Sequence, residues 1–272
     1  MYDKIAGKGD FDMNIDEMFN ENEKPLDRLC EGPSFCSIFR TVACVGDSLS
    51  SGEFETKNPD GTTKYTDCYE YSWGQFLGRD IGSLVYNFSR GGMTAKWFYD
   101  SYAKEANCFD PDKPADCYII AMGVNDVSSA LTKEDPIKFL GTVDDIDADL
   151  KEEERTFAWY YSAIVKKYRE ISPTAKFFFM TQPHADGEGK RAELKDRHAE
   201  LLYEMAEKLG NAYVLDFRKY APVYDKAFKE KFYLHGHMNA CGYALTAQMV
   251  KSYIDYIVRH NIGDFKFTGI KW

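Results

Sequence analysis

The stretch TVACVGDSLS, residues 41–50, decides the fold of this chain. Residues 41–46 form a short apolar run rich in β-branched side chains, which is typical of a strand buried in a parallel sheet. Ser48 follows this run directly. In a parallel α/β sheet the carboxyl ends of the strands border the ligand crevice. We therefore expect Ser48 to lie where ligands bind.

Similar apolar runs recur along the chain and alternate with amphipathic stretches. The further predicted strands are 84–89, 117–122, 176–181 and 212–216. Apolar residues at helical spacing predict helices at 156–171, 188–209 and 243–260. Gly242 precedes the last of these, and we expect it to relax the turn into that helix. The alternation predicts an α/β fold, a three-layer α/β/α sandwich around a mostly parallel five-stranded sheet.

Length and composition indicate one large domain. The 272 residues contain no linker-like segment, no repeat and no glycine-rich phosphate loop. Residues 1–38 are polar and lack a clear period, so we expect an N-terminal extension that packs on a single domain formed by residues 39–272.

Charge and hydropathy exclude several classes of partner. Lys and Arg total 34 against 44 Asp and Glu, a formal net charge of −10, so a nucleic-acid backbone would be repelled. No apolar run is long enough to span a membrane, and the first residues do not resemble a secretory signal, so a cytoplasmic location is expected. Seven cysteines without a C-x-x-C pair predict reduced thiols.

Two further strand ends carry residues suited to binding a negatively charged oxygen. Gly92 follows the second predicted strand, and its N–H can approach a ligand without a Cβ in the way. Asn125 follows the third strand and offers a side-chain amide at the same edge of the sheet. Together with the N–H of Ser48, these donors predict an oxyanion hole. Taken singly, each of the two segments also has the composition of an ordinary turn.

A histidine near the C-terminus supplies a candidate base. His237 lies in the segment LHGHMNACGY, residues 234–243, before the last predicted helix. From there its imidazole can accept the proton of Ser48 and later protonate a leaving alcohol.

These four segments resemble, in order, the four blocks of the GDSL (SGNH) hydrolase superfamily. The first is Gly46-Asp47-Ser48-Leu49. The second is N-x-x-x-x-G-x-T from Asn87 to Thr94, the third is G-x-N-D at 123–126, and the fourth is the histidine block. The resemblance covers about residues 40–260 and implies a flavodoxin-like sheet, ester or thioester hydrolysis, and no metal or organic cofactor. It also implies that Ser48, Gly92, Asn125 and His237 are the name-giving residues.

The last block departs from the family pattern. The family usually has an aspartate three residues before the histidine, where this chain has Leu234. That acid holds the imidazole in the productive tautomer, and its loss from a serine protease triad costs about 10⁴ in kcat. A backbone carbonyl could orient His237 in a Ser–His dyad, which we favour; a carboxylate from elsewhere, such as Asp216, could fill the gap; or the protein could be a poor catalyst.

Other histidines allow further interpretations. His235 and His237 form a His-x-His pair that, with Asp126 or Asp47, could hold a metal, although no metal-site signature supports this. His184 follows the fourth strand and is either a substrate contact or part of a surface loop.

We therefore predict a serine esterase that removes an acetyl or short acyl group, possibly from a carbohydrate, through an acyl-enzyme at Ser48. The alternatives are a catalytically weak ligand-binding member of the same fold, or a lysophospholipase- or thioesterase-type acyl hydrolase.

Overall fold

The computed structural model describes residues 18–270, and its centre is a five-stranded parallel sheet. The strand order is β4-β1-β5-β6-β7, and every neighbouring pair is parallel. The strands are β1 Thr41–Gly46, β4 Leu84–Ser89, β5 Cys117–Ala121, β6 Lys176–Met180 and β7 Ala212–Leu215. Each predicted strand matches one of these to within a residue, which confirms the predicted sheet.

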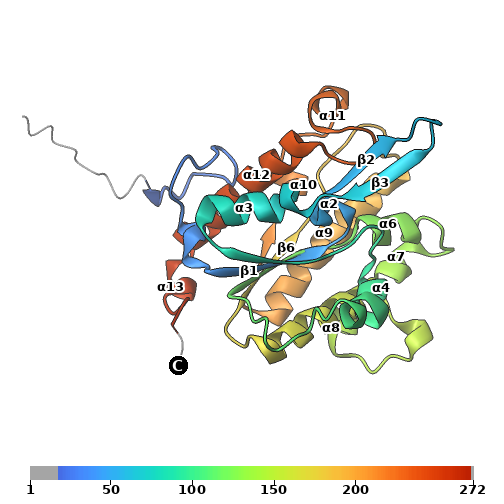
Figure 1. Ribbon diagram of the computed structural model, residues 1–272. Coiled ribbons are helices and arrows are strands. Elements are labelled where there is room, and N and C mark those ends of the chain that lie inside the picture. The colour runs from blue at the N-terminus through green and yellow to red at the C-terminus, as the bar shows by residue number, and fades with distance from the viewer. Residues whose placement is uncertain (1–17, 271–272) are drawn as a thin grey trace, which may run out of the picture.

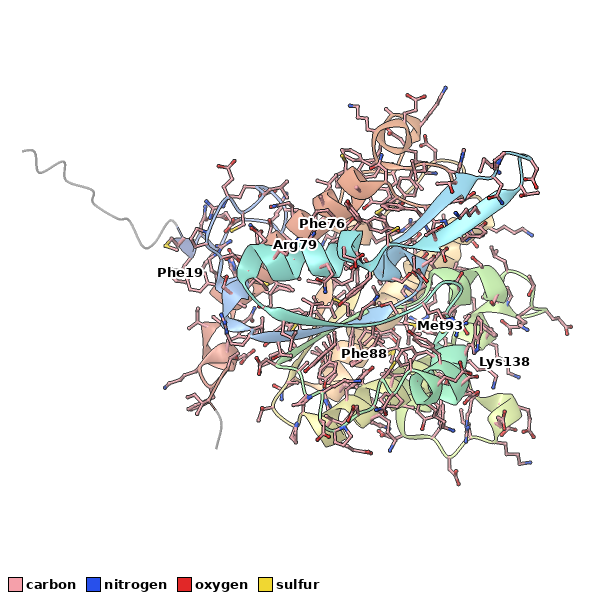
Figure 2. All side chains as sticks on the ribbon, in the orientation of Figure 1. Phe19, Phe76, Arg79, Phe88, Met93 and Lys138 are labelled. Atoms are coloured by element: carbon pink, nitrogen blue, oxygen red, sulfur yellow. The ribbon has the colours of Figure 1, made fainter. Side chains whose placement is uncertain are left out.

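Helices cover both faces of the sheet (Figure 1). On one face, α3 (Trp73–Ile81) and α12 (Ala240–His260) enclose a core with the strands. On the other face, α8 (Phe157–Ile171) and α9 (Lys190–Leu209) enclose a second core with the strands, and Phe88 of β4 is buried in this core. Figure 2 labels Phe88 together with Lys138, which lies at the surface. The three predicted long helices and the three-layer architecture are confirmed.

Shorter helices lie in the connections between these elements. The α-helices are α2 Ser48–Ser51, α4 Ala95–Trp97, α5 Ala103–Glu105, α6 Val124–Ala130, α7 Pro136–Leu140, α10 Phe217–Tyr220, α11 Lys226–Phe232 and α13 Ile262–Phe265. The 3₁₀ helices are Phe35–Ile38, Tyr69–Tyr71, Val143–Asp147 and Glu152–Glu154, and a π-helical turn spans Phe98–Tyr102.

The expected role of Gly242 is wrong. Helix α12 begins at Ala240 with Asn239 as its N-cap, so Gly242 lies inside the helix, where the Asn239 side chain accepts its N–H. A Cβ at Gly242 would lie 2.3 Å from the carbonyl oxygen of Phe232. Close packing against the preceding segment, and not freedom in a turn, therefore requires glycine at this position.

A two-stranded antiparallel hairpin, which we did not predict, projects from the body of the molecule (Figure 1). Strand β2 (Glu53–Lys57) pairs with β3 (Thr63–Asp67), and Glu55 lies opposite Tyr65. The connecting Asn-Pro-Asp-Gly at 58–61 is a turn signal between two short runs containing β-branched and aromatic residues, so the sequence did contain the evidence for it.

Residues 18–38 lie along α12. The backbone N–H groups of Cys30 and Phe35 donate to Ser252 and Asp255, and Glu23 forms an ion pair with Arg259 at 2.6 Å. The first 17 residues of the expected extension lie outside the described part of the chain.

All seven cysteines are free thiols. Within residues 18–270, no helix is long and apolar enough to cross a membrane.

Candidate active site

Ser48 occupies a tight turn at the carboxyl end of β1. Asp47 is the N-cap of α2, and its Oδ1 accepts the Leu49 N–H at 3.0 Å, so Ser48 is the first residue of this helix and not its cap. A Cβ at Gly46 would lie 2.4 Å from Ser50 Oγ, which explains the glycine before the turn. Asp47 is buried, and burial raises its pKa to about 6.

The segment after β5 holds the segment after β4 in place. Gly92 has φ +76°, a left-handed conformation that favours glycine. Nδ2 of Asn125 donates to the Met93 carbonyl at 3.0 Å, and the buried Asp126 carboxylate accepts the Ala95 N–H at 3.0 Å. Because an amide nitrogen carries two hydrogens, Asn125 keeps one for another acceptor.

A second buried contact supports this edge of the sheet. Gly123 has φ +135°, and a Cβ there would lie 2.2 Å from Nε2 of His198. The His198 ring is fully buried under this turn, and burial lowers its pKa to about 4, so it packs as a neutral ring. The sequence reading did not single out His198, which lies in the middle of α9 and belongs to none of the four blocks.

His237 is bracketed by two carboxylates from β2. Its Nδ1 lies 3.1 Å from Oε2 of Glu55, and its Nε2 lies 3.1 Å from Oε1 of Glu53. Tyr65 of β3 packs edge-on against the ring, with 5.6 Å between the ring centroids. The hydrogen bond with His237 holds the pKa of Glu55 below its usual value, whereas burial raises the pKa of Glu53.

One surface cavity of about 430 Å³ brings the four predicted site residues together. Its lining consists of Ser48, Gly92, Asn125 and His237 together with Glu53, Tyr65, Asp67, Arg90 and Gly91. The charged members of this lining, apart from the histidine, are two carboxylates and one guanidinium. The cavity can therefore place a polar substrate against a hydroxyl, an imidazole and two amide donors.

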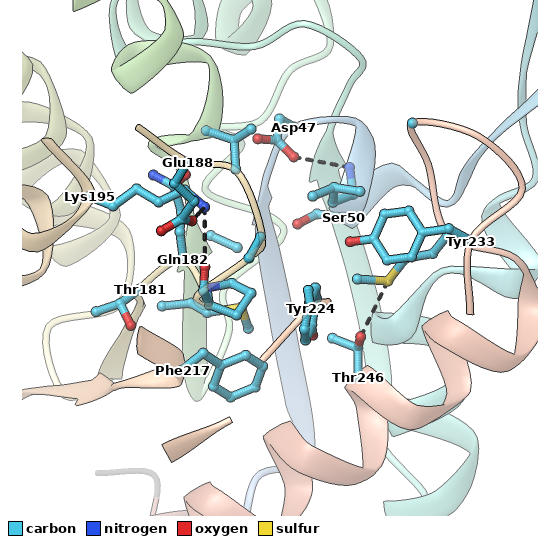
Figure 3. A pocket seen from close by; sticks show the side chains of 18 of the residues that line it. Asp47, Ser50, Thr181, Gln182, Glu188, Lys195, Phe217, Tyr224, Tyr233 and Thr246 are labelled. Atoms are coloured by element: carbon cyan, nitrogen blue, oxygen red, sulfur yellow. Dashed lines mark hydrogen bonds and ion pairs between the residues drawn. The ribbon is translucent and has the colours of Figure 1, made fainter. Parts of the chain in front are cut away.

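Figure 3 shows a second cavity, of about 410 Å³, with Asp47, Ser50, Phe217 and Tyr224 among its lining residues. Asp47, Val124 and Gly236 line it, and each is the sequence neighbour of a residue that lines the first cavity. Much of its wall is apolar, with Trp73, Met122, Met180, Phe217, Tyr224 and Met238 among its members. We call this the apolar cavity.

The other candidate residues lie elsewhere. The Asp216 carboxylate caps α10 and accepts hydrogen bonds from Thr181 and Tyr203, so it is engaged away from His237. His235 is exposed and lines a separate surface hollow beside α11. His184 is half exposed and lines neither cavity described above.

Glu53, Glu55, Tyr65 and Asp67 are site residues that the sequence reading missed. All four lie on the β2–β3 hairpin, and recognising its turn at 58–61 is the signal that could have drawn attention to them. Residues 18–270 contain no group of three or more His, Cys, Asp or Glu side chains that could hold a metal ion.

Comparison with known proteins identifies the family of this chain. The model of the GDSL-like lipase/acylhydrolase family matches residues 44–245, a range that contains Ser48, Gly92, Asn125 and His237. No curated protein matches the chain.

Solved structures share the fold at low sequence identity. A family two carbohydrate esterase from Clostridium thermocellum, in complex with cellohexaose, is 14% identical with a TM-score of 0.54, covering 87% of this chain and 67% of that one. A family two carbohydrate esterase with a carbohydrate-binding domain from Corynascus thermopiles (Myceliophthora fergusii) is 15% identical with a TM-score of 0.53, covering 87% and 69%. With the family match over most of its length, the chain belongs to the GDSL-like lipase/acylhydrolase family.

Proposed function

We propose that this protein is a serine esterase that hydrolyses a carboxylic ester through an acyl-enzyme at Ser48. Family membership supports hydrolysis of ester bonds in general. The observation that carries the proposal is the cavity in which Ser48, Gly92, Asn125 and His237 meet at the carboxyl edge of the sheet. These are the groups that acyl transfer needs, namely a nucleophile, a base and hydrogen-bond donors for the oxyanion.

In the first half of the reaction, Oγ of Ser48 attacks the ester carbonyl while its proton passes to Nε2 of His237. The tetrahedral intermediate then collapses, the C–O bond to the alcohol breaks, and Nε2 returns the proton to the leaving alkoxide. In the second half, water gives a proton to Nε2 and attacks the acyl-enzyme. The acid is released and the proton returns to Ser48.

The oxyanion is proposed to accept hydrogen bonds from the N–H groups of Ser48 and Gly92 and from the Asn125 amide. Ser48 is the first residue of α2, where backbone N–H groups lack partners within the helix. The bond from Asn125 to the Met93 carbonyl fixes the amide while leaving one hydrogen for the substrate. Each such donor contributes about 3 kcal/mol to lowering the barrier.

The lining of the cavity that holds Ser48 and His237 favours a substrate in which a short acyl group is attached to a hydroxyl-rich alcohol. Glu53, Asp67 and Arg90 offer hydrogen-bond partners to hydroxyl groups, as in polar binding sites generally. The apolar cavity has the more apolar wall, and its lining includes none of Ser48, Gly92, Asn125 and His237. The likeness to carbohydrate esterases agrees with an acetylated carbohydrate as the substrate.

A carboxylate at Nδ1 of His237 favours an enzyme over a binding protein that has lost catalysis. In an inactive member of the fold, nothing would need to hold the ring nitrogen that faces away from the nucleophile. Here Glu55 lies 3.1 Å from Nδ1, while the proposed mechanism uses Nε2 as the base.

The test is covalent labelling combined with turnover. We expect a fluorophosphonate to label the intact protein once, at Ser48, and Ser48→Ala to lose both labelling and hydrolysis of p-nitrophenyl acetate. A panel of acetylated sugars beside p-nitrophenyl esters of increasing chain length then ranks the substrates. Absence of labelling, with turnover unchanged in Ser48→Ala, would exclude the proposal.

A further inference from the structure

The hairpin places a carboxylate at each ring nitrogen of His237. Glu55 faces Nδ1 and Glu53 faces Nε2, each at 3.1 Å. The two glutamates are two residues apart on β2, so their side chains point to the same face of the hairpin. Neither belongs to the four sequence blocks, and 182 positions separate Glu55 from His237.

We propose that Glu55 is the positioning acid of this active site, supplied by the hairpin in place of the aspartate that Leu234 replaces. The inference rests on the proposed roles of Ser48 and His237. Glu55 accepts the Nδ1 hydrogen, which leaves Nε2 as the nitrogen that takes the proton of Ser48. Its charge then stabilises the imidazolium formed in that step.

Several contacts hold Glu55 in this position. Oε2 of Glu55 also accepts the Gly236 N–H at 2.8 Å, which ties the carboxylate to the loop that carries His237. A Cβ at Gly236 would lie 2.6 Å from the same oxygen, so glycine permits this approach. Tyr65, opposite Glu55 in the hairpin, packs against the imidazole.

The base of the hairpin is anchored as well. The Tyr243 hydroxyl of α12 donates to the Glu53 carbonyl at 2.6 Å, and Ser51 donates to the Asp67 carboxylate at 2.8 Å. The hairpin is therefore bonded to α12 and to α2, and through Gly236 to the loop that carries His237. Such support is what an orienting group needs in order to fix a rotamer.

Glu53 has a different effect, because it faces the nitrogen that must receive the proton. Hydrogen bonds from both ring nitrogens to carboxylates require both N–H protons, which is the imidazolium form. Glu53 thus competes with Ser48 for Nε2. The other titratable or charged groups around this ring are Asp47, Tyr65, Asp67 and Arg90.

The experiment compares Glu55→Gln, Glu53→Gln and the control Glu70→Gln, which makes the same change at an exposed site. A glutamine at 55 keeps the size of the side chain and an oxygen for the Gly236 N–H. We expect Glu55→Gln to lower kcat for p-nitrophenyl acetate by about 10²- to 10⁴-fold with KM within about threefold. Glu70→Gln should match the wild type.

The split between kcat and KM separates the two glutamates. With an acetylated sugar as substrate, we expect Glu53→Gln to change KM, because Glu53 lines the cavity that is proposed to bind the substrate. For Glu55→Gln we expect kcat to fall with KM nearly unchanged. A purely structural role for Glu55 would lower the melting temperature without this loss of kcat in folded protein.

Labelling of the wild type distinguishes failure of this inference from failure of the proposed function. If the wild type labels at Ser48 and folded Glu55→Gln keeps kcat and labelling rate within threefold, Glu55 has no positioning role and the esterase proposal stands. If the wild type does not label, both fail. Should Glu55→Gln not fold, Glu55→Asp carries the test, since a shortened carboxylate should lower kcat at constant KM and an unchanged kcat would overturn the inference.

Discussion

At the scale of single residues, specific contacts and backbone angles explain why glycine or asparagine occupies certain positions near the site. Glycine is required at Gly92 by a positive φ, and at Gly46 and Gly242 by the atoms that a Cβ would meet. Asn125 is held by its bond to the Met93 carbonyl. At this scale, the geometry of one N–H or one ring nitrogen decides whether the proposed chemistry can proceed.

Gly92→Ala should separate strain from catalysis. Gly92 and Gly82 share nearly the same φ, +76° and +68°, but Gly82 ends α3 and does not line the cavity that holds Ser48 and His237. Alanine at either position should cost about 1–2 kcal/mol of stability. Only Gly92→Ala should also lower kcat/KM, by about tenfold or more, because it displaces a donor of the oxyanion hole.

The measurement pairs denaturant unfolding with turnover of p-nitrophenyl acetate for both variants. Equal losses of activity in Gly92→Ala and Gly82→Ala would show that the effect is general destabilisation, and would remove Gly92 from the proposed oxyanion hole.

At the scale of elements, the β2–β3 hairpin depends on its joint with α12. Phe54 packs against the rings of Tyr71 and Tyr243, and the Tyr243 hydroxyl bonds the Glu53 carbonyl. The same hairpin carries Glu53 and Glu55 to His237. Loosening the joint should therefore affect both stability and the orientation of the imidazole.

Tyr243→Phe tests this joint, with Tyr168→Phe as its matched control. The first removes a buried hydroxyl that donates at 2.6 Å, and the second removes a buried hydroxyl that has no partner. We expect Tyr243→Phe to lose about 1 kcal/mol of unfolding free energy and part of kcat, and Tyr168→Phe to lose neither. Urea melts and initial rates measure both; a stable, fully active Tyr243→Phe would contradict the proposed dependence.

For the whole molecule, burial of carboxyl groups at the edge of the sheet makes stability depend on pH. Burial raises the pKa of Asp126 to about 7 and that of Asp47 to about 6. Unfolded aspartates titrate near 3.9, so between about pH 4 and 7 the native state binds protons that the unfolded state has released. This contribution to stability is complete below about pH 4 and is lost as pH rises through the folded-state pKa values.

Asp126→Asn should flatten that dependence. The asparagine oxygen can still accept the Ala95 N–H, while the buried charge is gone. We expect the unfolding free energy of the wild type to fall more steeply from pH 5 to 8 than that of the variant, and the exposed Asp112→Asn to follow the wild type. Unfolding curves at four pH values measure the slopes, and equal slopes in Asp126→Asn and the wild type would refute the assignment.

Much of the fold followed from local patterns, and much of the site did not. The strand from Thr41 to Gly46 and the helix from Phe157 to Ile171 were recognisable because their burial imposes periods of apolar residues on neighbouring positions. The serine, glycine, asparagine and histidine were recognisable by their order along the chain. Asp216 looked available to His237, but Thr181 and Tyr203 engage it.

The sequence by itself determined the strands, the long helices and the order of the four blocks, because these depend on contacts between near neighbours and on residue type. Only the tertiary structure decided which carboxylates meet His237, since Glu53 and Glu55 reach it from a hairpin remote in the chain. No local pattern encodes a contact of that range. It arises when a strand pair and a loop, each formed by its own local preferences, are packed against the same helix.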